Sequence, residues 1–309
     1  MTATTKRDYL HVTDLTPEEG YAIFDLAARL KAAPKGSHAH VLAGQAVAVI
    51  LEKPSLRTRG SYDVGVAQLG GYPLSAGAEF GMGEREPIKD AARVLSRYCD
   101  AIVYRTFGTD RLREMAAYAT VPVINALTNE GQPGQILCDL FTIREAFGTA
   151  QIAGRTVAFI GNGSSNTVTS LLEAARVFDL HLIVASPEAY RPTDAEITAA
   201  GAHLSFRSPL AAARAADVIY TDVWRDMGKE MDPVVMRQTF ADWTVDTELL
   251  SVAPPHAILL HCLPAHRGEE IMDDAIESTR SRVWDQAENR LHVQKALLCF
   301  LLDVMDKVP

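Results

Sequence analysis

The sequence predicts an α/β protein with two doubly wound domains, each built around a parallel β-sheet. Short apolar runs of strand length alternate with segments of helical periodicity as far as Gly148, and a second series of the same kind begins at Arg155. The chain has 309 residues, which is enough for two domains with separate cores. We therefore expect domains at residues 1–148 and 149–309, with a cleft between them.

Composition and charge exclude several classes of function. Apolar residues make up 48% of the chain, and the net charge of −9 argues against nucleic acid or an anionic membrane as the partner. No apolar run reaches the ~18 residues that span a bilayer, and the N-terminus lacks the apolar core of a signal peptide, so we expect a cytoplasmic protein. The four cysteines are scattered without metal-ligand spacing, which predicts neither a disulfide framework nor a metal site.

The first domain opens with a helix whose start is encoded locally. Thr16 is a typical N-cap, Pro17 suits the first helical position and two acids follow, so we expect a helix to about Lys35. The glycine-rich stretch at 76–86 indicates a loop of a kind that often carries function. The other elements expected in this domain are strands at 47–51, 101–104 and 121–126 and helices at 56–69, 88–98 and 136–147.

The chain is organised around the strand, turn and helix start at residues 47–59. Ser55 stands as the N-cap of this helix, whose first amides have no internal partner and whose dipole is positive there, so the turn can hold an anion. Arg57 and Arg59 flank Thr58, and a planar guanidinium matches phosphate oxygens two at a time. The alternative is a solvated basic turn with no ligand. The apolar residues that recur at helical spacing after the turn are Leu56, Tyr62, Val66 and Leu69.

A second basic group is expected beside this turn. The strand at 101–104 runs into Arg105, and open α/β sheets bind ligands at the carboxyl ends of their strands. We therefore expect Arg105 to meet the same anion as Arg57. Arg111 and Arg113 fall in the next helix, where we expect both to be solvated.

The second domain starts with a strand and a glycine-rich turn that match the dinucleotide-binding fingerprint only in part. Asn166 stands in place of the third glycine, and the next strand ends without the acid that binds a ribose. A nicotinamide enzyme is therefore an alternative, and we interpret Asn166 as a polar group at a helix start. The elements expected here are strands at 155–160, 180–185, 217–222 and 257–260 and helices at 167–178 and 291–305.

Two reactive side chains, His261 and Cys262, follow the last strand. A thiol beside an imidazole could form a nucleophilic pair. Neighbours in an extended segment point to opposite sides, however, so we expect these two side chains not to act together.

Five blocks, in the same order, resemble the aspartate/ornithine carbamoyltransferase family, and two of them resemble its ornithine branch specifically. Residues 55–59 are similar to the Ser-Thr-Arg-Thr-Arg phosphate loop, and 132–135 to the His-Pro-x-Gln turn. Residues 222–228 resemble the Asp-x-Trp-x-Ser-Met-Gly loop, 261–268 the His-Cys-Leu-Pro-Ala-His-Arg-Gly block and 288–295 the Glu-Asn-Arg-x-x-x-Gln-Lys block. The resemblance spans essentially the whole chain.

The resemblance implies transfer of the carbamoyl group of carbamoyl phosphate to the side-chain amine of ornithine or a closely related diamino compound, in arginine biosynthesis. It implies small-molecule substrates, no metal or organic cofactor, a homotrimer, and a C-terminal helix at 291–305 that packs back on the first domain. The carbamoyl-phosphate site it implies comprises Ser55, Leu56, Arg57, Thr58, Arg105, Gln132, Gln135, Cys262, Leu263 and Arg290. The amino-acid site it implies comprises Asn166, Asp222, Asp226 and Met227, and the residues implied to be catalytic are Arg57, Arg105 and Cys262.

The chain also departs from the family pattern. Leu56 removes a hydroxyl from the phosphate loop, Gln132 replaces the His of the family, and the loop around Gly81 lacks the family's Gln. A catalytically impaired paralogue that serves as a binding or assembly partner is therefore the alternative function. Ser165 replaces the first Asn of the family's pair, and Asp226 stands where the family has Ser. The second of these leads to the hypothesis that acceptor preference has moved from ornithine toward a related diamino compound.

Overall fold

The protein is described by a computed structural model that covers residues 6–225 and 232–308. It divides into two compact units, of which unit 1 contains Met1–Cys138 and Glu288–Pro309 and unit 2 contains Asp139–Ala287. The sequence predicts the division at residue 148, whereas the chain passes from unit 1 to unit 2 inside α5 (Pro133–Phe147). A continuous helix carries no break in its sequence pattern at that point, so the pattern shows only where the helix ends.

Unit 1 is built around a parallel sheet with the strand order β2-β1-β3-β4. Its strands are β1 (Ala46–Leu51), β2 (Tyr72–Gly77), β3 (Ala101–Arg105) and β4 (Val123–Leu127). Its helices, besides the first part of α5, are α1 (Pro17–Ala32), α2 (Leu56–Gln68), α3 (Ile88–Tyr98), α4 (Thr109–Tyr118) and most of α12 (Val283–Leu301). Short 3-10 turns lie at Val12–Asp14, Ala78–Phe80 and Met305–Lys307.

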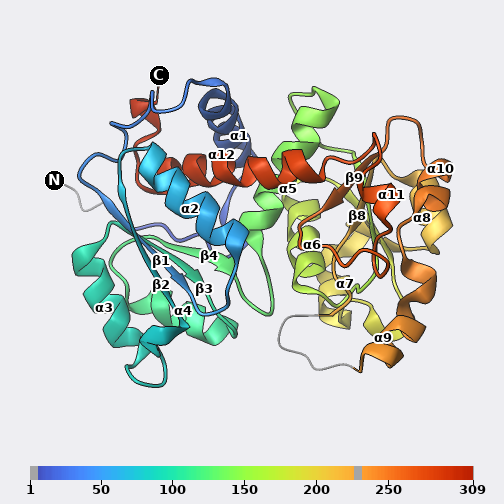
Figure 1. The fold of residues 1–309 in the computed structure, drawn as a ribbon, viewed down its shortest axis with the longest axis horizontal. Helices are drawn as coiled ribbons and strands as arrows, with labels where there is room; N and C mark the ends of the chain where they lie inside the picture. The colour runs from blue at the N-terminus through green and yellow to red at the C-terminus, as the bar shows by residue number, and fades with distance from the viewer. Residues whose placement is uncertain (1–5, 226–231, 309) are drawn as a thin grey trace. The chain divides into compact units, whose positions relative to one another are not determined.

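Alternation along the strands gives the sheet of unit 1 two buried faces. Ala48 and Ile50 of β1 join one core cluster with Ile88 of α3 and with Leu112 and Met115 of α4. Figure 1 shows α3 and α4 on this side of the sheet and α1 and α2 on the other. A sheet covered on both faces leaves its strand ends as the place where polar side chains can gather.

The sheet order of unit 1 explains where its site lies. After β1 the chain adds β2 on one side and then β3 on the other, so the topology switches between β1 and β3. Leu51, the last residue of β1, lies opposite Arg105, the last residue of β3. The Ser55 turn and Arg105 therefore leave the sheet at the same edge, as the sequence predicts.

Unit 2 repeats this plan with the strand order β7-β6-β5-β8-β9, again parallel throughout. Its strands are β5 (Thr156–Ile160), β6 (His181–Ala185), β7 (Leu204–Phe206), β8 (Val218–Thr221) and β9 (Ile258–His261). Its helices are α6 (Asn166–Phe178), α7 (Asp194–Ala200), α8 (Pro209–Ala215), α9 (Pro233–Phe240), α10 (Thr247–Val252) and α11 (Asp273–Ile276). Its 3-10 turns are Glu188–Tyr190, Gly201–His203 and Ala241–Trp243.

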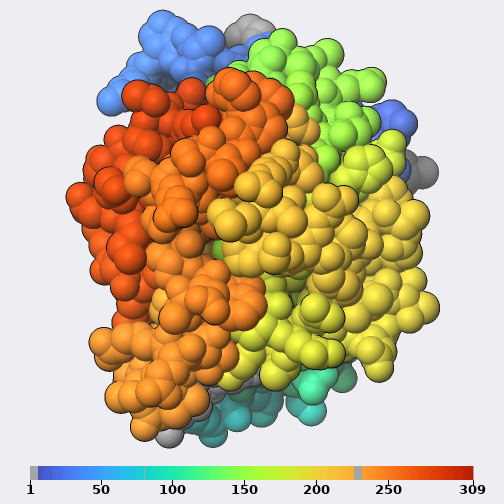
Figure 2. All heavy atoms as spheres, turned by 90° about the vertical axis from the view of Figure 1, so that its right-hand side faces the viewer, coloured from blue at the N-terminus to red at the C-terminus, as the bar shows by residue number. Residues whose placement is uncertain are grey.

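The switch in unit 2 lies between β5 and β8. One face of this sheet packs on α8, α10 and α11 through a cluster that includes Ile160, Ile219 and Leu259. The later segments of the unit, drawn yellow to orange, cover the face shown as spheres in Figure 2. The polar residues that follow β5 and β8 therefore have the same topological position as those that follow β1 and β3.

Most of the predicted elements are confirmed. Helix α1 begins at a capping box in which Thr16 and Glu19 each bond the other's backbone amide, although it ends at Ala32 and not near Lys35. Helix α3 has the predicted bounds. In the described part of the chain no helix is long and apolar enough to cross a bilayer, and none of the four cysteines is in a disulfide.

Candidate functional site

The first turn of α2 has the geometry predicted for an anion site. Ser55 is the N-cap, and its hydroxyl accepts a hydrogen bond from the amide of Thr58 at 3.2 Å while contacting the Thr58 hydroxyl at 3.0 Å. The capping bond aligns the first turn, whose amides and dipole favour a negative charge. Arg57 is half-buried here, whereas Arg59 is exposed and pairs with Asp63 at 3.6 Å. Of the two cations at this turn, Arg57 is thus the less exposed, while Arg59 lies at the helix surface beside Asp63.

A buried hydrogen-bond cluster joins this turn to the end of the chain. The Arg290 guanidinium on α12 donates to the Thr58 hydroxyl at 2.8 Å and, through its other terminal nitrogen, to the Gln135 side-chain oxygen. All three residues are buried, and among the described residues the Arg290 Nε has no hydrogen-bond partner. Burial raises the pKa of Tyr62, which lies near Arg290, far above the usual range for a phenol, so this neighbour stays neutral. Within residues 6–225 and 232–308 no carboxylate is bonded to this buried guanidinium, which suits it to an anionic ligand.

Further polar groups gather at the same sheet edge of unit 1. Arg105 and Gln132 are both buried, as expected of residues that line a site rather than face solvent. The sequence prediction missed Lys53, which is also buried, bonds the Asn129 side chain and lies 4.7 Å from the centre of the Phe107 ring. The sequence contained a sign of this role, because Lys53 stands directly before the turn that was predicted to bind an anion.

Two predictions for unit 1 are wrong. Leu56 was expected on the apolar face of α2, but it is 84% exposed because the first helical residue points away from the core. Arg111 was expected to be solvated, but its guanidinium pairs with the buried Glu52 carboxylate at 2.5 Å. Arg113, on the same helix, is exposed as predicted.

In unit 2 the turn between β5 and α6 is fixed by close packing and by one amide. A Cβ atom at Gly163 would lie 2.9 Å from the Tyr190 carbonyl oxygen, so a larger residue does not fit there. Asn162 donates to the Trp224 carbonyl at 2.9 Å and accepts from the amide and hydroxyl of Ser164. Asn162 thereby ties the turn after β5 to the loop after β8, a role that was not predicted.

The start of α6 holds the predicted Asp222. Ser165 caps the helix by accepting from the Val168 amide at 3.4 Å, and Asn166 is the first helical residue. The Thr167 hydroxyl donates to Asp222 Oδ2 at 2.6 Å, and the Val223 amide donates to Oδ1 at 2.8 Å. Asp222 is buried with both oxygens engaged, which orients the carboxylate. Thr167 was not predicted, although its place in the first turn of a helix beside the site was visible.

Trp224 anchors the loop that follows Asp222. It is buried, stacks on Phe240 with 5.5 Å between ring centres, and belongs to a small core with Met236. Trp224 thus packs beneath this loop, and Asp222 is a buried acid. Asp226 and Met227, predicted for this loop, lie outside the described residues.

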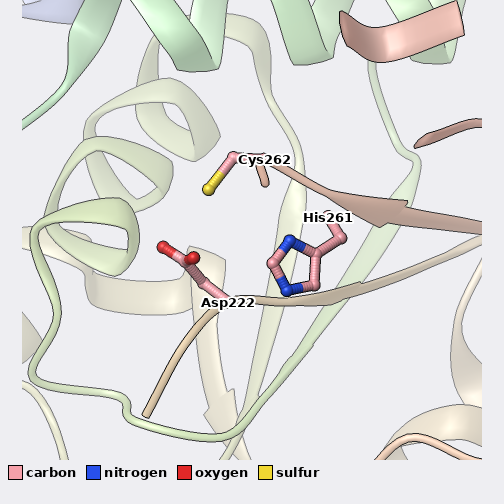
Figure 3. Close-up of side chains that lie close together, drawn as sticks. All are labelled: Asp222, His261 and Cys262. Atoms are coloured by element: carbon pink, nitrogen blue, oxygen red, sulfur yellow. The ribbon is translucent and has the colours of Figure 1, made fainter. Parts of the chain in front are cut away.

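Three side chains at the ends of β8 and β9 lie close together, as Figure 3 shows for Asp222, His261 and Cys262. Atoms of these three residues lie within 4.8 Å of one another, so the expected separation of His261 from Cys262 is wrong. Strand β9 ends at His261, so Cys262 lies outside its extended ladder, and Leu263, the next residue, has a positive φ of 57°. His261 is nevertheless no base for the thiol: its Nδ1 accepts from the Leu263 amide at 2.9 Å and its Nε2 contacts Glu270 at 3.0 Å.

The same two bonds decide whether this trio could hold a metal ion. An imidazole ligand needs a free ring nitrogen, and both nitrogens of His261 are engaged within the protein. The other described cluster of metal-ligating types, His266, Glu269 and Glu270, shares the carboxylate that serves His261. Neither group offers a complete set of free ligands.

The two units therefore define a protein that binds two small polar ligands, an anion at the edge of the first sheet and a second ligand beside an acid and a thiol in unit 2. Two family models match the chain: "Aspartate/ornithine carbamoyltransferase, carbamoyl-P binding domain" over residues 7–145 and "Aspartate/ornithine carbamoyltransferase, Asp/Orn binding domain" over 153–301. The ornithine carbamoyltransferase of Sorangium cellulosum is 53% identical, with 97% of this chain and 98% of the relative covered.

Solved structures agree with the sequence matches. The ornithine carbamoyltransferase of Thermus thermophilus is 40% identical with a TM-score of 0.87, covering 97% of this chain and 100% of that one. The enzyme of Pyrococcus furiosus is 40% identical with a TM-score of 0.89, covering 98% and 99%. The chain belongs to the aspartate/ornithine carbamoyltransferase family, and within it to the ornithine branch, as the five sequence blocks predicted.

Proposed function

We propose that this protein transfers the carbamoyl group of carbamoyl phosphate to the side-chain amine of ornithine, forming citrulline and releasing phosphate. The observation that carries the donor half of this proposal is the buried cluster of Thr58, Gln135 and Arg290 beside the Ser55 turn. It combines cationic and neutral donors, which suits a ligand with a phosphate at one end and an amide at the other. The family models and relatives support the same reaction.

In the donor half we assign the phosphate to the start of α2 and the nearby cations. Ser55, Thr58 and Arg57 would hold its oxygens, with the helix amides, and Leu56 would contribute its backbone alone. Arg105 and Arg290 would reach both the phosphate and the carbonyl oxygen, while Gln135 accepts from the carbamoyl amide. Gln132 would donate its side-chain amide to the carbonyl oxygen in place of the family's His.

In the acceptor half we assign the amino acid to the start of α6 and the loop after β8. Asn166 would bind the carboxylate of the substrate, and Asp222 would bind its α-ammonium group, with Asp226 and Met227 near it. Cys262 and Leu263 would lie beside the attacking amine. The carboxylate of Asp222 is already aimed by Thr167 and Val223, so binding an ammonium there needs little reorganisation.

The reaction itself needs positioning and charge stabilisation. The neutral amine attacks the carbonyl carbon, a C–N bond forms, and the C–O bond to phosphate breaks with its electron pair leaving on the phosphate. The amine then loses a proton. Negative charge grows first on the carbonyl oxygen and then on the leaving phosphate, where Arg57 and Arg105 would stabilise it in both places.

We further propose that the protein works as a homotrimer in the cytoplasm and serves arginine biosynthesis. Large apolar side chains on the surface of unit 1 support self-association, among them Leu56 at 84%, Tyr98 at 70% and Tyr72 at 66% exposed. Light scattering coupled to gel filtration tests the trimer. Growth of a bacterium that needs arginine because it lacks its own ornithine carbamoyltransferase tests the metabolic role.

The deciding experiment measures citrulline and phosphate formed from carbamoyl phosphate and ornithine by the purified protein. Equal amounts of both products, with turnover of about 1 s⁻¹ or more, are expected of a working enzyme. Phosphate-site binding by calorimetry without any product would instead favour the impaired paralogue, which the similarity to ornithine carbamoyltransferases over the whole chain does not favour.

A further inference from the structure

A buried carboxylate, Glu52, lies at the end of β1, three positions before the N-cap of α2. Its two oxygens accept from the Tyr104 hydroxyl at 2.8 Å, from the Thr106 hydroxyl, and from the Arg111 guanidinium at 2.5 and 3.2 Å. Tyr104 and Thr106 are the residues on either side of Arg105. The Glu52 carboxylate therefore joins both strand ends from which the proposed phosphate ligands project.

Arg111 extends this network to the glycine-rich loop at 78–86. The nitrogen that bonds Glu52 also donates to the Met82 carbonyl at 2.5 Å. Gly83 has a positive φ of 83°, and a Cβ atom there would lie 2.3 Å from the second terminal nitrogen of Arg111. The loop can pass over the guanidinium because this residue has no side chain.

The charges of this network matter because of where it lies. Glu52 is an anion at the sheet edge to which we assign a phosphate dianion, so an unpaired carboxylate there would repel the substrate. Arg111 pairs with it through two nitrogens and neutralises it. A need for solubility does not explain the position of Arg111, since Arg113 on the same helix already places a charge in solvent.

We propose that Arg111 is a positioning residue for the carbamoyl-phosphate site, a role that rests on the function proposed above. Through Glu52 it neutralises a carboxylate that opposes phosphate binding at the described strand ends of β1 and β3, and it holds the Glu52 bonds to the side chains of Tyr104 and Thr106, on either side of Arg105. Through the Met82 carbonyl it holds the loop at 78–86 against that edge. The residue acts through its neighbours and does not touch the substrate.

The test measures the affinity of the full chain for inorganic phosphate and for carbamoyl phosphate by calorimetry. Arg111→Met should weaken both by about tenfold, because the Glu52 charge is left without its partner. The double variant Glu52→Gln with Arg111→Met should regain most of that loss, since the neutral amide can accept from one of the Tyr104 and Thr106 hydroxyls and donate to the other. Arg113→Met is the matched control and should bind like the wild type.

A second measurement, hydrogen exchange of residues 78–86, separates the charge of Arg111 from its contact with the loop. Arg111→Lys should keep most of the phosphate affinity and still raise exchange in the loop, because an ammonium cannot span Glu52 and Met82 with a planar fork. KM for carbamoyl phosphate should rise in Arg111→Met with KM for ornithine unchanged.

Several outcomes would overturn the inference. Wild-type affinity in Arg111→Met would remove the charge argument, and a double variant as weak as the single one would show that Arg111 serves folding alone. Should Arg111→Met fail to fold, the double variant and Arg111→Lys still decide whether Arg111 positions the phosphate site or serves folding alone. Absence of phosphate and carbamoyl-phosphate binding by the wild-type chain is a distinct result, which would overturn the proposed function itself.

Discussion

The Arg290 guanidinium donates to the Thr58 hydroxyl at 2.8 Å although 232 positions separate the two residues in the sequence. One residue belongs to the first turn of α2 and the other to α12, near the end of the chain. The anion site of unit 1 is therefore complete only when the last helix has packed onto it. The Lys31–Asn289 and Lys295–Gln68 hydrogen bonds, at 2.8 and 2.9 Å, tie the same helix to α1 and α2.

This relationship predicts a specific effect of Thr58→Val. The substitution keeps the shape of the side chain but removes the hydroxyl that Arg290 bonds, and the phosphate loses a ligand at the same time. Each such bond to a charged group contributes about 1.5–3 kcal/mol, so carbamoyl-phosphate affinity should fall by roughly one to two decades. Calorimetry on Thr58→Val and on Thr58→Ser, which retains the hydroxyl, checks this. Equal affinities in the two variants would contradict the assignment.

The departures from the family pattern predict an effect in the opposite direction. Leu56→Thr together with Gln132→His should tighten carbamoyl-phosphate binding or raise turnover with ornithine, because each restores a family group that reaches the donor substrate. Leu56 is highly exposed, so its exchange should leave stability unchanged, whereas Gln132 is buried and its replacement has to fit. Steady-state kinetics on both single variants and the double variant measure the gain. If neither KM nor kcat improves, the site is adapted to its present residues.

Local sequence rules predict those parts of the site that local interactions determine. Ser55 is recognisable as an N-cap because capping depends on a hydroxyl three residues before an amide, and the structure has that bond. The end of β3 at Arg105 follows from an apolar run that stops at a charge. Both are properties of a few consecutive residues, and both were predicted.

The contacts that join distant segments could not be predicted in this way. From the sequence alone, Glu52 is indistinguishable from any acid before a turn, and Arg111 is indistinguishable from a solvated helix residue. The two side chains meet only because folding brings β1, β3 and α4 together. Asn162 and Trp224 meet because β5 and β8 are neighbours in the sheet, which strand order alone determines. The helices from α7 to α11 are short, at four to eight residues, so their periodicity is too brief to distinguish from loop.

The hydrogen bond from Thr167 to Asp222 predicts that a variant of Thr167 changes the KM of the amino acid substrate alone. In Thr167→Val the Asp222 Oδ2 loses a buried donor at 2.6 Å, which leaves the carboxylate less well oriented. KM for ornithine should rise by about tenfold while KM for carbamoyl phosphate stays unchanged. Thr167→Ser restores the donor and should behave like the wild type. A rise in both KM values would indicate a general loss of structure instead.

Two buried imidazoles of unit 1, His38 and His292, predict a loss of stability in mild acid. Burial lowers the pKa of both, and the Lys295 ammonium lowers it further. The unfolded chain, with an ordinary His pKa of 6.5, then binds more protons than the native state. The two histidines should therefore make their full contribution to the free energy of unfolding above pH 6.5. That contribution should decrease as the pH falls from 6.5 toward the lowered pKa of the folded state.

Urea unfolding at a series of pH values between about 7.5 and 5 measures this effect, since the midpoint follows stability at constant m. His38→Gln and His292→Gln should each flatten the curve below pH 6.5, because the substituted side chain binds no proton in either state. His181→Gln, at an exposed site, is the control and should keep the slope of the wild type. A slope unchanged in all three variants would assign the acid sensitivity to other groups.

The last prediction concerns the acceptor and rests on Asp226, which lies outside the described residues. A second carboxylate near Asp222 attracts a cationic substrate and repels the substrate's own carboxylate, and each such pairing at ~4 Å is worth about 4 kcal/mol at an effective dielectric near 20. We expect the balance to favour diamino compounds related to ornithine, so that 2,4-diaminobutyrate, lysine or putrescine compete with it better in the wild type than in Asp226→Ser. Initial rates for these amines with both proteins measure the preference. If the wild type strongly prefers ornithine and the substitution changes no ratio, Asp226 has no part in choosing the acceptor.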